Sequence, residues 1–113
     1  MMRDDDAVVM IWSTYPDAAA AEEAARALVE ARLAACAVLL PTIASIYRWE
    51  GRIEKAEEVG LLLKTTRARA RETRAALERD HPYDVPAALT LSVEAASAAY
   101  GAWVVAETTP LVP

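Results

Sequence analysis

The chain has 113 residues, the size of a single domain, and 55% of them are hydrophobic. Its net charge of −5 argues against nucleic acid and anionic membrane as main partners, because both require a cationic surface. A lone cysteine cannot form an internal disulfide, and the sequence shows neither a signal-peptide pattern nor an apolar run of about 20 residues. We therefore expect a cytoplasmic protein that binds neither nucleic acid nor membrane.

The sequence predicts one folded stretch between two short tails. Residues 1–6 are acidic and predict a disordered tail. Residues 7–107 predict a single domain, and residues 108–113 a C-terminal tail.

The first predicted elements are a strand and a helix. Residues 7–14 form a short, almost continuous apolar run, which is typical of a buried strand. Asp17 is then expected to cap a helix over residues 18–33. Three residues at i, i+4 spacing predict a solvated stripe, namely Glu22, Arg26 and Glu30. The predicted inward-facing residues are Ala24, Leu28 and Ala31.

Two long strands follow: residues 37–50 are rich in β-branched and aromatic residues, and residues 53–66 place alternate side chains on opposite faces. Glu50-Gly51 predicts the turn between them. Fourteen strand residues span about 46 Å, whereas a domain of this length has a diameter of about 34 Å. An extended hairpin would therefore expose its apolar tip and unpaired edges, which favours coverage by a second copy. The alternative is that Pro41 and Gly60 break the arms and fold the ribbon back on its own sheet.

The remaining chain predicts a helix, a strand and a final helix. Thr66 is expected to cap a helix over residues 67–80, which Pro82 ends. Residues 88–93 predict a fourth strand, and residues 94–106 a helix. That helix is expected to carry Tyr100, Trp103 and Val104 on one side, at i, i+3 and i+4. The order β-α-β-β-α-β-α predicts an α+β fold of the ferredoxin-like split β-α-β type, with a long hairpin and an extra C-terminal helix.

The reactive residues do not assemble a catalytic site. The predicted topology places Cys36 and His81 at opposite ends of the sheet, with His81 beside the end of the first strand, so they cannot form a nucleophile pair. Cys36 lacks a basic neighbour and is expected to be a buried structural thiol. His81 has two interpretations: a residue that stabilises a helix C-terminus, or a fragment of a metal site with Asp80 and Ser13. We expect no enzyme.

Lys64 lies within a mostly apolar strand and should have a partner, because an unpaired buried charge is costly. Glu58 points to the same face. Lys64 is therefore expected either to line a cleft for a small anionic ligand between subunits or to form an interfacial ion pair.

Four sequence blocks resemble one known family. They are Ser45-Ile46-Tyr47-Arg48-Trp49-Glu50-Gly51-Arg52-Ile53-Glu54, Leu33-Ala34-Ala35-Cys36, Leu63-Lys64-Thr65-Thr66 and His81-Pro82-Tyr83-Asp84-Val85-Pro86. With this spacing the chain resembles the CutA family of divalent-ion tolerance proteins from about Val8 to Val104. The resemblance departs at Ala87 and Gly101, where the family has an acidic and a larger apolar residue.

The resemblance implies a homotrimer, similar in architecture to the PII signalling proteins, whose long hairpins clasp neighbouring copies. It also implies a role in tolerance to copper and other divalent cations, association with acetylcholinesterase anchoring for eukaryotic members, and no enzymatic activity. No cofactor is required, although a divalent metal could bind weakly.

The resemblance further implies positions for these functions. The family's copper ligands, a thiol and a histidine pair, match Ser13, Asp80 and His81. Two of the three are thus oxygen groups, which copper favours less than thiolate and imidazole. The residues expected at the intersubunit cleft and in assembly are Tyr47, Trp49, Glu50, Glu58, Lys64, Tyr83 and Trp103. The open alternatives are a PII-like sensor of a small anionic ligand and a purely structural assembly module.

Overall fold

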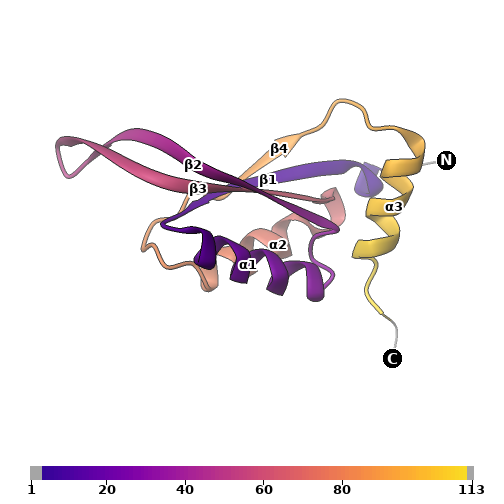
Figure 1. Ribbon diagram of the computed structural model, residues 1–113. Helices are drawn as coiled ribbons and strands as arrows, with labels where there is room; N and C mark the ends of the chain where they lie inside the picture. The colour runs from indigo at the N-terminus through magenta and orange to yellow at the C-terminus, as the bar shows by residue number, and fades with distance from the viewer. Residues whose placement is uncertain (1–3, 112–113) are drawn as a thin grey trace.

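The computed structural model describes residues 4–111. It is an α+β fold with one antiparallel sheet of four strands in the order β2-β3-β1-β4 (Figure 1). The strands are β1 (Val8–Tyr15), β2 (Cys36–Trp49), β3 (Arg52–Thr66) and β4 (Leu89–Ser92). The helices are α1 (Ala18–Glu30), α2 (Arg67–Arg79) and α3 (Ala98–Thr108). Within the described residues, no helix is long and apolar enough to cross a membrane.

The helices α1 and α2 lie side by side on one face of the sheet and enclose the core (Figure 1). Alternate residues of the two central strands point toward them, including Val9, Ile11 and Leu61, which are at most 1% exposed. The other face is covered by α3 only near the start of β1, where Val104 packs with Val8 and Ala35. The rest of that face carries partly exposed apolar side chains.

The capping residue of α1 is predicted correctly, but part of its buried face is not. Asp17 accepts a hydrogen bond from the backbone N–H of Ala20 at 2.8 Å. Leu28 is buried as expected, whereas Ala24 is only partly buried and Ala31 is exposed. The buried residues are Ala21, Ala25 and Leu28, at i, i+4 and i+7.

The helix α1 ends at Glu30, three residues before the predicted end, because the chain turns at Arg32. Arg32 has a φ of 60°, in the left-handed region. The backbone N–H of Leu33 donates to the carbonyl oxygen of Leu28, which closes the helix in the manner of a Schellman motif. An arginine therefore takes the position that glycine usually occupies.

The hairpin of β2 and β3 is extended, as one of the two alternatives predicts. Its turn at Glu50-Gly51 has positive φ at both residues. Pro41 and Thr42 do not break the arm: the register shifts between Leu40 and Ile43, and pairing then continues to the turn. The molecule measures 49 × 31 × 22 Å, and the hairpin projects well beyond the helices (Figure 1). The fold-back alternative is therefore wrong.

Gly60 keeps the middle of the hairpin close to β1. A Cβ at this residue would lie 2.5 Å from Cη2 of Trp12, because the indole packs directly across the glycine. Gly60 thus serves close side-chain packing rather than a break in the arm.

The two ends of the chain differ from the sequence-based expectations. Asp4–Asp6 form a 3-10 turn, whereas residues 1–6 were expected to be disordered; residues 1–3 lie outside the described part. The helix α3 begins only after Ser97, whose side chain accepts from the N–H of Tyr100, and it runs through Thr108. Thr108 is buried, although the predicted tail begins there; residues 112–113 are not described.

The buried face of α3 packs against the start of β1. Its buried residues are Gly101, Val104 and Thr108. Of the three residues expected on one side, Val104 is buried, whereas Tyr100 and Trp103 are 36% and 43% exposed and their rings lie next to each other.

The helix α2 runs from Arg67 to Arg79, one residue shorter than predicted. Thr66 occupies its N-cap position, but its side chain makes no capping hydrogen bond. The fourth strand is also shorter than predicted, at Leu89–Ser92.

Candidate functional site

His81 lies just beyond the end of α2 and beside the end of β1, as the topology predicts. Its Nε2 is 2.9 Å from the carbonyl oxygen of Thr14 and 3.2 Å from Oγ of Ser13. The imidazole stacks on the ring of Tyr15 with centroids 4.2 Å apart. The loop after α2 is thereby attached to the end of β1.

Both ring nitrogens of His81 are engaged. The backbone N–H of Tyr83 donates to Nδ1 at 3.0 Å, so Nδ1 must be unprotonated. The proton then sits on Nε2, which donates to the carbonyl oxygen of Thr14. Burial lowers the pKa of His81, more than the Thr14 carbonyl and the Glu58 carboxylate raise it. The imidazole is therefore neutral near pH 7, and neither nitrogen has a free lone pair for a metal.

Tyr83 extends the site from His81 to the carboxylate of Glu58. Its ring centroid lies 4.9 Å from that of His81, and its hydroxyl donates to Oε2 of Glu58 at 2.8 Å. Burial alone would raise the pKa of Glu58, but the hydroxyls of Ser45, Tyr83 and Thr14 and the nearby His81 together lower it. Burial and the same carboxylate raise the pKa of Tyr83. A charged Glu58 is thus held by a neutral phenol.

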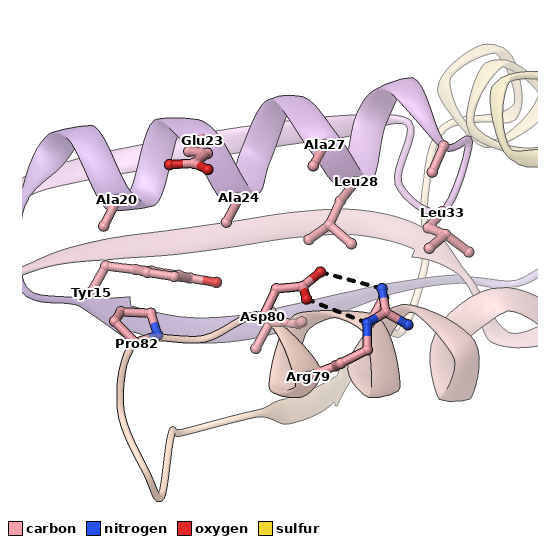
Figure 2. Close-up of a pocket in the computed structure, with 13 residues that line it drawn as sticks. Tyr15, Ala20, Glu23, Ala24, Ala27, Leu28, Leu33, Arg79, Asp80 and Pro82 are labelled. Carbon is pink, nitrogen blue, oxygen red and sulfur yellow. Dashed lines mark hydrogen bonds and ion pairs between the residues drawn. The ribbon is translucent and has the colours of Figure 1, made fainter.

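Asp80 does not join Ser13 and His81. Its carboxylate pairs with the guanidinium of Arg79 at 3.2 Å, and both side chains are about 70% exposed. Figure 2 shows this pair beside the groove between α1 and α2. Within residues 4–111, no three histidine, cysteine, aspartate or glutamate side chains gather in a way that could hold a metal. The three predicted ligands therefore do not converge on one point.

Lys64 and Trp103 lie at the opposite end of the sheet from the hairpin tip. The ammonium of Lys64 is 5.5 Å from the ring centroid of Tyr100, which lies 5.6 Å from that of Trp103. Glu58 is bound by Tyr83, so Lys64 and Glu58 do not pair within the chain. No ion pair among the described residues includes Lys64.

The other predicted assembly residues, Tyr47, Trp49 and Glu50, occupy the hairpin tip. Tyr47 and Trp49 are 42% and 48% exposed. The seven predicted residues therefore fall into three places: the tip, the site around His81, and the cluster around Lys64.

Cys36 begins β2 and pairs in register with Lys64, toward the start of β1, whereas His81 lies at the end of β1. The predicted separation of the thiol from His81 is confirmed. The thiol is only partly buried, so the expectation of full burial is wrong.

The sequence gives little indication of two groups that complete the site. In the sequence Tyr15 only marks the end of a strand, whereas in the structure its ring stacks on the imidazole of His81. The Thr14 group that binds His81 is a backbone carbonyl, which carries no residue-type signal. Only the predicted topology, in which the second helix ends next to the end of the first strand, indicates that His81 lies near Thr14 and Tyr15.

Comparison with known proteins identifies the family and supports the fold. Residues 9–107 match the model of the family described as CutA1 divalent ion tolerance protein. The divalent-cation tolerance protein CutA of Pectobacterium atrosepticum is 42% identical over 87% of this chain and 88% of its own length. The crystal structure of CutA from Xylella fastidiosa, 39% identical, covers 90% of this chain and 98% of its own with a TM-score of 0.88. CutA from Archaeoglobus fulgidus, described as a periplasmic divalent cation tolerance protein, is 29% identical over 90% of this chain and 99% of its own, with a TM-score of 0.87. The chain belongs to the CutA1 family of divalent ion tolerance proteins.

Proposed function

We propose that the protein serves divalent-cation tolerance as a non-enzymatic homotrimer whose hairpins clasp neighbouring copies. The observation that carries this proposal is the projecting hairpin with its apolar tip, where Ile46 and Ile53 are 71% and 62% exposed. Extended apolar ribbons with open edges seldom remain uncovered. The strand order supports a ferredoxin-like sheet, whose face opposite α1 and α2 is available for assembly wherever α3 does not cover it.

That face adds a second apolar surface to the tip. Its exposed side chains alternate along β2 and β4 and surround Trp12: Val38, Leu40, Leu89 and Leu91. The apolar surface thus continues from the body of the domain toward the hairpin. A symmetric closed assembly would cover both parts with the same chain.

Sedimentation equilibrium tests the assembly. The expected mass is three times the 12.2 kDa of one chain. Ile46→Lys at the tip should lower the mass toward one chain, because it places a charge in the proposed contact. Val29→Lys is the matched control, since Val29 is 38% exposed on α1, away from the tip. A wild-type mass near 12.2 kDa would refute the trimer.

Any divalent metal would bind weakly near His81. A metal at Nδ1 must displace the N–H of Tyr83, and one at Nε2 must remove a proton that binds Thr14. Copper titration by calorimetry into wild type and His81→Ala tests the site. We expect weak binding that the substitution reduces; identical isotherms would exclude His81 as a ligand.

A second candidate function is a PII-like response to a small anionic ligand in a cleft between subunits. Lys64 favours it, because this ammonium contacts an aromatic ring and no carboxylate among the described residues. A thermal-shift screen with nucleotides and phosphorylated metabolites, on wild type and Lys64→Gln, would detect it. If neither metal nor anion stabilises the protein, the role is that of a structural assembly module.

A cytoplasmic location is part of the proposal. The single, partly buried cysteine suits a reducing compartment. Fractionation of cells that produce the full-length protein tests it, and recovery in a periplasmic fraction would overturn it.

A further inference from the structure

The helices α1 and α2 leave a groove of about 350 Å³ between them (Figure 2). Four alanines of α1 line it at helical spacing: Ala20, Ala24, Ala27 and Ala31. Each contributes one methyl group, so together they cannot fill the space that faces α2. The opposite wall includes Leu77 and Pro82. The groove lies on the helix-covered side and stays open if the other face of the sheet is used for assembly.

The phenol of Tyr15 reaches this groove from below. Tyr15 is 1% exposed, and its hydroxyl makes no hydrogen bond of normal geometry among residues 4–111; the Ser13 hydroxyl is near enough to lower the pKa of Tyr15 but bonds to His81 instead. Figure 2 shows the hydroxyl directed along the groove toward Asp80. Buried phenol groups normally have a partner. Burial raises the pKa of Tyr15 to about 12, so the group is a neutral hydroxyl that can both donate and accept.

The charges at the groove favour a cation. Glu23 lines the groove from α1 and makes no ion pair within the described residues. Asp80 and Arg79 line it from the end of α2, and their mutual ion pair is exposed. An exposed pair of this kind is weak, so Asp80 can accept a second partner. Two carboxylates and one guanidinium leave an excess of negative charge.

We propose that this groove binds a small amphipathic amine. Its alkyl part would lie on the alanine stripe, and its ammonium group would lie between Glu23 and Asp80 and donate to the hydroxyl of Tyr15. The apolar floor selects for a hydrocarbon chain, the carboxylates select for positive charge, and the hydroxyl gains its missing partner.

Titrations followed by amide NMR on the full chain test the proposal with three matched probes: hexylamine, hexanol and hexanoate. Hexylamine should give saturable shifts in the α1 amides and at Asp80 in the millimolar range. Hexanol should bind at least about fivefold more weakly, and hexanoate should not saturate. Equal affinity for hexylamine and hexanol, or no saturation with hexylamine, would overturn the proposal.

Variants locate the site. Ala27→Leu should weaken hexylamine binding about fivefold or more by filling the groove, whereas Ala19→Leu, on the exposed side of the same helix, should not. Glu23→Gln should weaken it, and Glu22→Gln should leave it unchanged, because Glu22 does not line the groove. Tyr15→Phe should weaken it as well. Ala27 is exposed, so its variant keeps the core intact even if the Tyr15 variant does not fold. Unchanged affinity in Ala27→Leu would refute the location.

Discussion

Tyr83 donates its backbone N–H to Nδ1 of His81 across 3.0 Å, and this one bond fixes the tautomer of the chain's only histidine. With Nδ1 occupied, the proton resides on Nε2 and bonds to the carbonyl oxygen of Thr14. The histidine thus holds the loop after α2 against the end of β1. A metal would compete with these bonds.

His81 should titrate below its ordinary value of 6.5, because burial disfavours its charged form. At a pH between the pKa of His81 in the folded protein and its value of about 6.5 in the unfolded chain, the unfolded chain binds more protons. The unfolding free energy therefore falls as the pH drops below about 6.5. Imidazole NMR should show the Nε2–H tautomer. Urea denaturation at several pH values measures how the unfolding free energy changes with pH. In this pH range the change should be smaller for His81→Asn than for wild type. A folded-state pKa at or above 6.5 would contradict the prediction.

Tyr83→Phe should lower the unfolding free energy by about 1–3 kcal/mol, because Glu58 loses a hydrogen bond while remaining buried. The pKa of Glu58 in the folded state should rise. The charged Glu58 stabilises the fold at a pH above its pKa in the unfolded chain, and this stabilisation is lost as the pH falls through its pKa in the folded protein. In the variant the loss should therefore begin at higher pH. Tyr100→Phe serves as the control. Equal urea midpoints for the two variants would argue against the role of Glu58.

Gly60→Ala should destabilise the protein by about 1–3 kcal/mol, because its Cβ would lie 2.5 Å from the indole of Trp12. In a Trp12→Leu background the same change should cost less, since the smaller side chain leaves room. Thermal and urea unfolding of the four proteins in this double-mutant cycle measures the coupling. A coupling of zero would mean that the indole moves aside without cost.

Arg32→Ala should destabilise by about 1–2 kcal/mol, because the guanidinium donates to the carbonyl oxygens of Ala106 and Thr109, each at 2.9 Å. Arg32→Gly loses the same bonds but relieves the left-handed backbone, which recovers about 1 kcal/mol. Hydrogen exchange should rise at the end of α3 in both variants. If exchange there does not change, Arg32 does not hold the helix.

Local patterns and chain order predict much of this molecule. The Asp17 cap, the Glu50-Gly51 turn and the hairpin strands follow from residue types within a few positions. The position of His81 beside β1 follows from topology alone. These features depend little on which rotamers the side chains adopt.

Other features depend on competition that the sequence does not reveal. The predicted start of the last helix, at residue 94, lies three residues before its N-cap at Ser97, and Gly101 and Thr108 are buried because they share a face with Val104, which packs on Val8 and Ala35. Asp80 is adjacent to His81, yet its carboxylate pairs with the neighbouring Arg79. Asp80 and His81, two predicted metal ligands that are adjacent in sequence, therefore contact different groups.

The turn at Glu50-Gly51 also has a kinetic consequence. It joins the two longest strands, so the most extensive ladder of the sheet forms between adjacent segments, whereas β1 must find β3 across the chain, with Val8 opposite Thr66. Local pairing closes a short loop and is fast, while distant pairing carries the larger entropic cost. We expect the ribbon to form early and the docking of β1 to limit the folding rate. Rate-based φ-values near zero in the ribbon would show the reverse order.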